Sequence, residues 1–440
     1  MSYSYSVYFW IRTTDTRRDF PAIATNKGWN GGLVRDYTDS HNYGSSRTTG
    51  SLCGWAIVLQ PNGAWAWNLG DGEQRLDYQP TGRRQVVSDG EWHLLAFVID
   101  PNDLAARLYY DGIQVALYSL ASLNLVEQAK GNFGVLFGQD ETLHEIPVAL
   151  KSDQILQLFK ERMLPMPFTY PKFTTKDRLS MMSWNIWNGG REDGNDVGLN
   201  RVVEIIRKSG ADVIAMQETY GSGPKIADAL GYHLYLRSSN LSIISRYPAV
   251  SHHSYYKPFN LGGVTLQLSP SLSIDVFTLW LHYLPDFCKD VLLEGITPEV
   301  LQENEWDTRA SEINQIIVEI SKNFSDSRLF IAGDFNCPSH LDWTDSSRHL
   351  HKNLVVKWPV STQMIDAGFI DSYRNFYTDE KKYAGHTWTP RNPNSWQDRI
   401  DYIYYRGSGI YCVEADVLNK HQIKWPSDHA AVFAKFEIEI

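Results

Sequence analysis

A change of residue periodicity near Leu179 divides this chain into two regions that point to different fold classes. Before it, residues 1–138 hold short apolar and aromatic runs separated by turn sequences such as PNG, PND and DG. Turn signals that recur about every dozen residues are typical of an all-β sandwich. After it, apolar runs alternate with amphipathic segments, which is the pattern of a layered α/β domain. A chain of 440 residues also exceeds one ordinary domain, so its length predicts two or three domains.

The N-terminal region contains the stretch SDGEWHLLAFVIDPNDLAARLYYDGIQVA, in which a DG-x-WH strand is followed by a hairpin ending in x-Y-x-DG. This stretch resembles the laminin-G and concanavalin-like jelly rolls. The resemblance implies a β-sandwich over residues 1–163, closed by the helix-like KSDQILQLFKERM, and it specifies no ligand. Trp92 and His93 are expected to pack inside the sheets. The three prolines of residues 164–178 indicate a linker.

The C-terminal region, residues 179–440, begins with the apolar strand pattern LSMMSWNI. The amphipathic run DVGLNRVVEIIRKSG follows and ends on a glycine, which predicts a helix with a glycine C-cap. A second helix is predicted at ASEINQIIVEISKNF, directly before the buried-strand pattern RLFIAGDFN. The region therefore predicts strands and helices in packed layers.

Polar residues repeatedly end the apolar strands of this region. A single carboxylate at a strand end is most often a turn former. The same kind of position recurs here too often for that explanation, which favours convergence of these side chains on one cleft. The residues are Asn185, Glu218, His282, Asp334, Asn336, Asp401, Asp428 and His429.

Convergence of these groups has a chemical consequence. Carboxylates at close range cannot all ionise without shared protons or a cation. Oxygen ligands without a thiolate cluster favour a hard divalent ion, Mg²⁺, Mn²⁺ or Ca²⁺. Histidines beside them can move protons or stabilise an anion near neutral pH. This combination is suited to hydrolysis of a phosphoester.

The motifs SWNIWNG, QE, LH, GDFN, RIDYIYY and SDH occur here in this order, from about Leu179 to the C-terminus. Together they resemble the endonuclease/exonuclease/phosphatase superfamily. The resemblance implies a four-layered α/β sandwich with two mixed sheets, and a divalent-metal-dependent phosphoester hydrolase. The cofactor implied is Mg²⁺ or Mn²⁺, with Ca²⁺ also compatible.

The resemblance also implies roles for individual residues. The metal ligands would be Asn185, Glu218 and Asp428. The catalytic residues would be His282, Asp334, Asn336, Asp401 and His429. The general base stays open between His429 and Asp334.

Substrate-binding residues are expected around the motifs. We expect His386, Trp187 and His340 to contact substrate, while Trp343 and Trp388 are as readily explained by core packing. Enzymes of the exonuclease III type place an aspartate where Trp187 stands, which disfavours an abasic-site endonuclease. CPSHLDWTDSSRH follows GDFN where an inositol phosphatase would carry a basic segment.

Bulk composition narrows the partners. The net charge of −10 gives no global basic field for coating nucleic acid. The favoured substrate is a small, lipid-linked or glycan-linked phosphoester, with the β-sandwich binding or positioning the carrier through, for example, a carbohydrate ligand. A DNase-like endonuclease and an inactive ligand-binding protein remain the alternatives.

Compartment signals are few. The four cysteines form no CxxC pair, no apolar run reaches the ~18 residues of a membrane span, and the N-terminus lacks signal-peptide features. The chain as given indicates a cytoplasmic protein, and a secreted protein whose signal has been removed would look the same.

Overall fold

The computed structural model describes residues 4–16, 20–29, 52–124, 134–135, 143–163, 173–174, 178–325 and 327–439. Contacts divide the chain into two compact units, which we describe in turn. Unit 1 comprises residues 1–170, 220–239 and 244–248, and unit 2 comprises residues 171–219, 240–243 and 249–440. The predicted linker, 164–178, lies almost wholly outside the described residues. No helix in the described ranges is long and apolar enough to cross a membrane.

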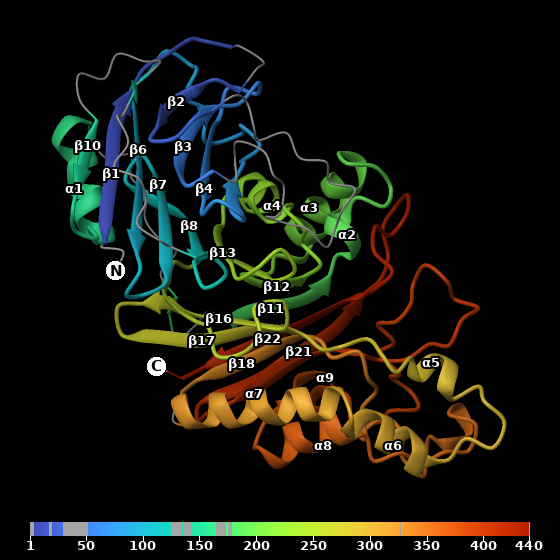
Figure 1. Ribbon diagram of the computed structural model, residues 1–440. Coiled ribbons are helices and arrows are strands. Elements are labelled where there is room, and N and C mark those ends of the chain that lie inside the picture. The colour runs from blue at the N-terminus through green and yellow to red at the C-terminus, as the bar shows by residue number, and fades with distance from the viewer. Residues whose placement is uncertain are drawn as a thin grey trace. The chain divides into compact units, whose positions relative to one another are not determined.

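Unit 1 contains strands of two sheets, each with an antiparallel run of five strands (Figure 1). The strands of the first, in spatial order, are β10 (His144–Ile146), β1 (Tyr5–Ile11), β6 (His93–Asp100), β7 (Ala105–Tyr110) and β8 (Ile113–Ser119). Those of the second are β5 (Arg75–Tyr78), β4 (Trp65–Gly70), β3 (Gly54–Leu59), β2 (Ala22–Thr25) and β9 (Gly134–Val135). Helix α1 (Ser152–Arg162) follows.

Aromatic side chains from both sheets form the core of unit 1. Trp55 of β3 meets Phe97 of β6 edge-on at 5.0 Å between ring centroids, and Trp67 of β4 meets Tyr118 of β8 at 5.9 Å. This interdigitation of two inner faces defines a β-sandwich. The predicted all-β class is confirmed, while most of the predicted strand at residues 131–140 lies outside the described residues.

The two residues of the DG-x-WH motif differ in burial. His93 is buried, with Nδ1 2.9 Å from Asp111 Oδ2 and Nε2 3.1 Å from Asp89 Oδ1. Trp92 is only half-buried, and the guanidinium of Arg162 lies 4.0 Å from its ring centroid. The expectation of internal packing therefore holds for His93 and only in part for Trp92, which packs against the buried cluster of Trp10, Leu94 and Phe159.

A segment from the middle of the chain completes unit 1. It contains helix α4 (Gly223–Leu230) and strand β13 (His233–Leu236), which pairs in parallel with β8. Gln85 Nε2 donates to Asp228 Oδ1 at 3.1 Å, and the His233 ring lies 2.7 Å from the carbonyl of Gln114. Strand β14 (Ser242–Ser245) has residues in both units.

Unit 2 is built on two mixed sheets that face one another. The strands of its first sheet, in order, are β12 (Val213–Gln217), β11 (Arg178–Asn185), β22 (Ala431–Ile438) and β21 (Ile410–Leu418). Those of its second are β15 (Ala249–His253), β16 (Leu261–Ser269), β17 (Leu272–Trp280), β18 (Leu329–Asp334), β20 (Asp401–Arg406) and β19 (Ile370–Asp371). Phe436 packs between the sheets against Phe330 and Tyr405, with centroids 5.0 and 5.2 Å apart.

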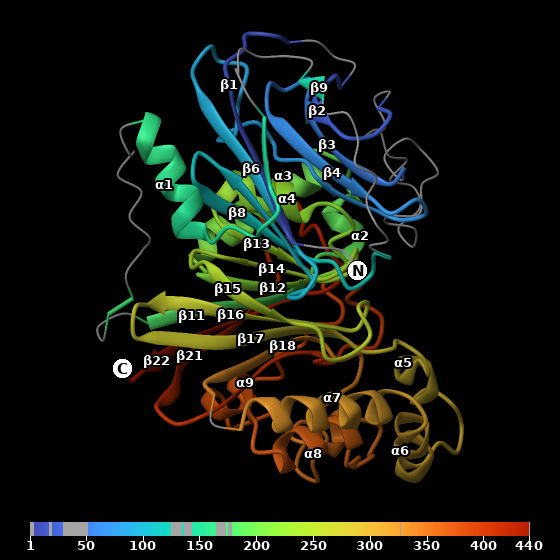
Figure 2. The same ribbon diagram turned by 60° about the vertical axis from the view of Figure 1, so that its left-hand side comes forward.

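Helices cover the outer faces of unit 2, as Figures 1 and 2 show. Helix α3 (Val197–Ser209) lies beyond the first sheet and ends at Gly210, whose φ of 69° is the left-handed C-cap expected from the sequence. Helices α7 (Arg309–Asn323) and α8 (Pro359–Asp366) lie side by side beyond the second sheet. This order of helix, sheet, sheet and helix confirms the predicted four-layered sandwich. The shorter helices are α2 (Trp187–Gly190), α5 (Phe287–Asp290), α6 (Pro298–Trp306) and α9 (Ser372–Phe376), with a 3₁₀ turn at Arg348–Leu350.

Candidate active site

The ends of strands from both sheets of unit 2 carry a cluster of polar side chains. Asn185 is the last residue of β11, Asp334 is the last of β18, and Asp401 is the first of β20. Because β18 and β20 are antiparallel neighbours, Asp334 and Asp401 are paired in register. Glu218 directly follows β12, and Asp428 and His429 stand just before β22. Facing sheets therefore bring residues from five separate segments together.

His429 lies between two carboxylates. Its Nδ1 is 2.9 Å from Asp401 Oδ2, and its Nε2 is 3.8 Å from Asp334 Oδ2. All three residues are buried. The backbone N–H of His429 donates to Ser427 Oγ at 3.0 Å, and Ser427 Oγ donates to the carbonyl of Asn185 at 2.7 Å. These bonds fix the imidazole relative to β11.

Asn185 links two more carboxylates. Its Nδ2 donates to Asp334 Oδ2 at 3.0 Å and to Glu218 Oε1 at 3.2 Å. Its Oδ1 accepts the backbone N–H of Trp187 at 3.0 Å. Glu218 Oε2 accepts the backbone N–H of Asn188 at 3.0 Å. Asn185 thus bridges the catalytic and metal-ligand sets inferred from the sequence, through its amide nitrogen as the side chain is oriented.

Backbone conformation at the site is unusual. Trp187, Asn188, Glu218 and Asn336 all have φ between 49° and 56°. Residues other than glycine adopt this left-handed region rarely, and such strain concentrates at functional sites. The loops after β11, β12 and β18 therefore carry strain where their polar side chains meet.

Gly333, the residue before Asp334, lets strand β18 lie close to β17. A Cβ on Gly333 would lie 2.2 Å from the carbonyl oxygen of Leu279 on the neighbouring strand. No larger residue fits without displacing that backbone. The strand pattern LFIAGD therefore contains a glycine because β17 approaches closely, one residue before the carboxylate.

The carboxylates of the site have shifted pKa values. Burial raises the pKa of Asp334 to about 7, with the charge of Asp401 adding to the effect and that of His429 opposing it. Burial also raises the pKa of Asp428 to about 6, and the charge of Glu218 adds to this. Burial alone would lower the pKa of His429, but Asp401 and Asp334 hold it well above its ordinary value.

The donor set fits a hard cation. Asp401 Oδ1 and Asp428 Oδ1 are buried and accept no hydrogen bond from the residues that the structure describes. Buried carboxylate oxygens left in this state are costly unless a cation or proton meets them. Asp334, Asp401 and His429 offer ligand atoms within 4.8 Å of one another, and His429 also pairs with Asp401 through Nδ1.

The remaining residues inferred from the sequence lie further out. Asn336 donates its backbone N–H to Asp334 Oδ1 at 2.9 Å and its side-chain Nδ2 to the carbonyl of Leu281 at 2.8 Å. His282 lies two residues beyond β17 rather than at its end, and it is exposed, with its ring bonded to Leu284 of its own loop. Asn336 is therefore bonded directly to the cluster. His282 is connected to it only through the backbone of Leu281, whose N–H donates to the carbonyl of Asp334 at 3.0 Å.

Some of the residues inferred to contact substrate border the cluster, and others bond to residues elsewhere. His340 bonds Ser361 Oγ through Nδ1 at 2.8 Å, and His386 is exposed. The Trp187 ring lies under the guanidinium of Arg391, whose centre is 5.0 Å from the ring centroid. Trp388 meets the His429 ring edge-on at 5.0 Å, whereas Trp343 is buried and donates Nε1 to Asp398 Oδ2 at 3.0 Å. Trp388 thus borders the cluster, and Trp343 is a core residue.

Several positioning residues have no distinct sequence signal. Thr387 Oγ1 accepts the backbone N–H of Asp401 at 3.1 Å, and its carbonyl accepts that of Ala430 at 2.8 Å. Asn240 Oδ1 accepts the N–H of Glu218 at 2.8 Å. These threonine and asparagine contacts join segments that are far apart in the sequence, so no local pattern predicts them. Thr387 belongs to the sequence GHTW, which contains the predicted substrate-binding residue His386, whereas Asn240 lies in no motif.

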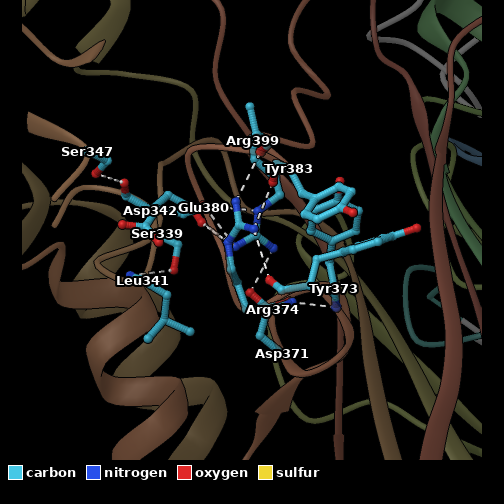
Figure 3. A network of polar contacts seen from close by, with 12 residues as sticks. Ser339, Leu341, Asp342, Ser347, Asp371, Tyr373, Arg374, Glu380, Tyr383 and Arg399 are labelled. Carbon is cyan, nitrogen blue, oxygen red and sulfur yellow. Dashed lines mark hydrogen bonds and ion pairs between the residues drawn. The ribbon is translucent and has the colours of Figure 1, made fainter. Parts of the chain in front are cut away.

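A buried ionic network supports the start of β20 (Figure 3). Arg399 Nη1 lies 2.7 Å from Asp371 Oδ2, and Arg399 Nη2 lies 2.8 Å from Asp342 Oδ2. Arg374 pairs with the other oxygen of Asp342, and Asp371 Oδ1 caps α9. Because Arg399 stands two residues before Asp401, the network fixes the backbone that positions Asp401, the partner of His429.

Comparisons with known proteins agree with this geometry. Residues 182–429 match the model of the Endonuclease/Exonuclease/phosphatase family, and residues 1–144 match that of the Concanavalin A-like lectin/glucanases superfamily. The uncharacterized protein F14F9.5 of Caenorhabditis elegans is 27% identical over 295 residues, which cover 60% of this chain and 93% of that protein.

Solved structures are similar to part of the chain. TDP2 from Caenorhabditis elegans is 18% identical, with a TM-score of 0.41, over 59% of this chain and 74% of that one. An AP endonuclease from Archaeoglobus fulgidus is 17% identical, with a TM-score of 0.42, over 59% of this chain and 100% of that one. The family match spans more than half of this sequence and contains every residue of the cluster. The chain therefore belongs to the endonuclease/exonuclease/phosphatase family and is a phosphoester hydrolase with an N-terminal concanavalin-like domain.

Proposed function

We propose that this chain hydrolyses a small, lipid-linked or glycan-linked phosphoester with the help of one hard divalent cation, Mg²⁺ or Mn²⁺. The observation that carries the proposal is the position of His429 between Asp401 and Asp334, with Asn185 joining Asp334 to Glu218. Four carboxylates, one amide and one imidazole in one cluster, buried apart from the half-buried Glu218 and Asp428, match the needs of phosphoester hydrolysis.

The cation would be held by Glu218, Asp428 and Asn185. Glu218 is close enough to Asp428 for its charge to raise the pKa of Asp428, and Asp428 Oδ1 lacks a hydrogen-bond donor among the described residues. Asn185 would turn its carbonyl oxygen toward the ion, in place of the amide nitrogen that now faces two carboxylates. When bound, such a cation neutralises phosphate oxygens. Ca²⁺ suits the same oxygen donors.

Asp334 is the general base in this proposal. The amide nitrogen of Asn185 and the backbone N–H of Asn336 donate to its two oxygens, which sets the direction in which it can accept a proton from water. His429 is already held at Nδ1 by the buried Asp401. A doubly flanked imidazole of this kind stays protonated, so His429 donates its Nε2–H to the charge that develops on the phosphate.

The outer residues have supporting roles. Asn336 ties the end of β18 to the carbonyl of Leu281, the residue before His282. His282 would meet the leaving group or the phosphate from the rim, where its ring is exposed. His340, His386 and Trp187 would contact the rest of the substrate. Residues 1–163 would bind or position the carrier, for which a carbohydrate ligand suits the family match.

A substrate screen tests this proposal. Phosphate monoesters, phosphodiesters, a lysophospholipid and plasmid DNA are each incubated with Mg²⁺, Mn²⁺ or Ca²⁺, and product release is compared between the wild type and Asp334→Asn. The proposal expects metal-dependent release from a small or lipid-linked ester that the variant loses. Plasmid nicking that falls steeply with salt, with no turnover of small esters, would replace it with a nuclease.

A further inference from the structure

Three cations converge on a single carboxylate next to the candidate active site. Arg391 Nη2 lies 3.0 Å and Lys424 Nζ lies 2.7 Å from Asp193 Oδ1, while Arg201 Nη1 lies 2.8 Å from Asp193 Oδ2. The cations come from α3 and from two loops far along the chain. We name Asp193, Arg201, Arg391 and Lys424 the cation cluster.

The cation cluster is joined to both loops that carry the inferred metal ligands. Arg391 Nη1 donates to the carbonyl of Pro426 at 3.3 Å, two residues before Asp428. The Trp187 ring beneath Arg391 belongs to the loop after β11, two residues beyond Asn185. Two residues span at most about 7 Å of chain. The cluster therefore borders the site on the side of Asn185 and Asp428.

The charges of the cluster are unequal. One carboxylate faces three cations, and two of them share the same oxygen of Asp193. Neighbouring like charges repel each other, and a second anion between them would relieve this. The preceding acidic residue, Glu192, accepts a hydrogen bond from Asn188 Nδ2 at 2.9 Å and pairs with none of the three cations in the described contacts.

Exposure shows which cations can reach a ligand. The side chain of Lys424 is 52% exposed, whereas those of Arg391 and Arg201 are 18% and 14% exposed and that of Asp193 is 10% exposed. The Lys424 side chain is therefore reachable from solvent while its Nζ pairs with Asp193, and Arg391 is held rigid between Trp187, Asp193 and Pro426. A fixed guanidinium beside an accessible ammonium is suited to binding a phosphate group.

We propose that Arg391 and Lys424 form a second-anion site, which binds a phosphate of the substrate other than the one that is cleaved. The inference rests on the proposed function and narrows its substrate class to phosphoesters that carry a second phosphate. A pair of surface lysines would not suffice for this, but a stacked arginine tied to the loop of Asp428 gives the anion a fixed position. The second phosphate raises affinity and aligns the scissile group with the cluster of Asp334 and His429.

A matched substrate pair tests the second-anion site. Thymidine 5′-(p-nitrophenyl phosphate) and its 3′-phosphate differ only in a second phosphate, as do glycerophosphoinositol and its 4-phosphate. For the wild type we expect the added phosphate to lower KM on the order of tenfold, equivalent to ~1.4 kcal/mol. In Lys424→Met the ratio of the two KM values falls toward one. Lys420→Met, an exposed lysine of the same loop, keeps the wild-type ratio.

The outcomes separate the two proposals. Equal KM values for both members of each pair, in a wild type that hydrolyses them, would overturn the second-anion site and leave the proposed function standing. A KM ratio that Lys424→Met leaves at the wild-type value would overturn it as well. Failure to hydrolyse any ester would refute the proposed function, and calorimetry with thymidine 3′,5′-bisphosphate and thymidine 5′-monophosphate then decides the site by affinity alone. Which pair responds distinguishes a nucleotide from a lipid headgroup as the source of the phosphate.

Discussion

His429 Nδ1 lies 2.9 Å from Asp401 Oδ2, and both groups are buried. Arg399, two residues before Asp401, pairs with the buried Asp371 and so fixes the start of β20. A buried carboxylate in this position fixes the tautomer of the imidazole and stabilises its protonated form. The opposite nitrogen is left to face Asp334.

Asp401→Asn tests this relationship. The amide has the size of the carboxylate but no charge, so His429 loses its protonated state and its orientation. We expect kcat to fall by on the order of a hundredfold or more, with the fold retained. The measurement is kcat on the best substrate together with circular dichroism. The control Asp416→Asn, at an exposed position of β21, keeps full activity, and equal losses in both variants would contradict the role of Asp401.

Glu218→Gln tests the cation site. The variant keeps an oxygen donor but removes a negative charge from the proposed ligand set, which weakens binding of a hard cation. The Mg²⁺ or Mn²⁺ concentration that gives half-maximal activity is expected to rise on the order of tenfold or more. A metal titration of the wild type, Glu218→Gln and the exposed Glu303→Gln checks this. An unchanged titration curve for Glu218→Gln would exclude Glu218 as a ligand.

The strand ends of the site were predictable because they leave a local pattern. Asn185 and Asp334 each stand where an apolar run ends, Asp401 stands inside RIDYIYY, and the structure places all three at strand termini. The order of the motifs then pointed to one fold family, which fixes the layers. Periodicity and motif order therefore sufficed for the fold class and for the position of these groups.

Other parts of the molecule depend on contacts that no local pattern encodes. Asp342, Asp371 and Arg399 meet only after folding, and each taken alone is an ordinary charged residue. Helix α8 has a weak apolar stripe, and its clearest sequence signal is Pro359 at the first turn. The exposed position of His282 follows from β17 ending at Trp280, two residues earlier than the apolar run suggests.

Arg399→Met tests the buried network of Figure 3. Removing the guanidinium leaves Asp342 and Asp371 as buried carboxylates that each lose a partner. Breaking a buried pair in this way costs ~3–5 kcal/mol of unfolding free energy. Urea unfolding measures the loss against Arg348→Met, which breaks the exposed pair with Asp345 and is expected to cost less than ~1 kcal/mol. Equal losses in the two variants would show that the network contributes nothing special.

His351 gives a prediction for pH. Burial lowers the pKa of this imidazole to about 4, and its ring stacks on Trp343 with centroids 4.3 Å apart. The unfolded chain takes up a proton near the ordinary pKa of ~6.5, whereas the folded chain does so only near 4. The contribution of the neutral His351 imidazole to the free energy of unfolding is therefore complete above about pH 6.5, and it is lost as the pH falls from there toward about 4.

The variant His351→Phe keeps the stacked ring and removes the titration. Its Tm should fall less than that of the wild type between about pH 7 and about pH 5. Differential scanning fluorimetry at both pH values measures the difference. His349→Gln, which removes an exposed histidine two residues away, should follow the wild type. A His351→Phe curve parallel to the wild type would contradict the lowered pKa.

Metal-dependent release of product from a phosphoester, in the wild type and in Asp334→Asn, tests the proposed chemistry most directly. With Mg²⁺ or Mn²⁺ the wild type should hydrolyse the ester, chelation with EDTA should stop it, and re-addition of the ion should restore it. Asp334→Asn should bind the ion and turn over on the order of a hundredfold or more slowly. Hydrolysis that persists in EDTA, or that Asp334→Asn carries out at the wild-type rate, would contradict a metal-assisted site built on Asp334.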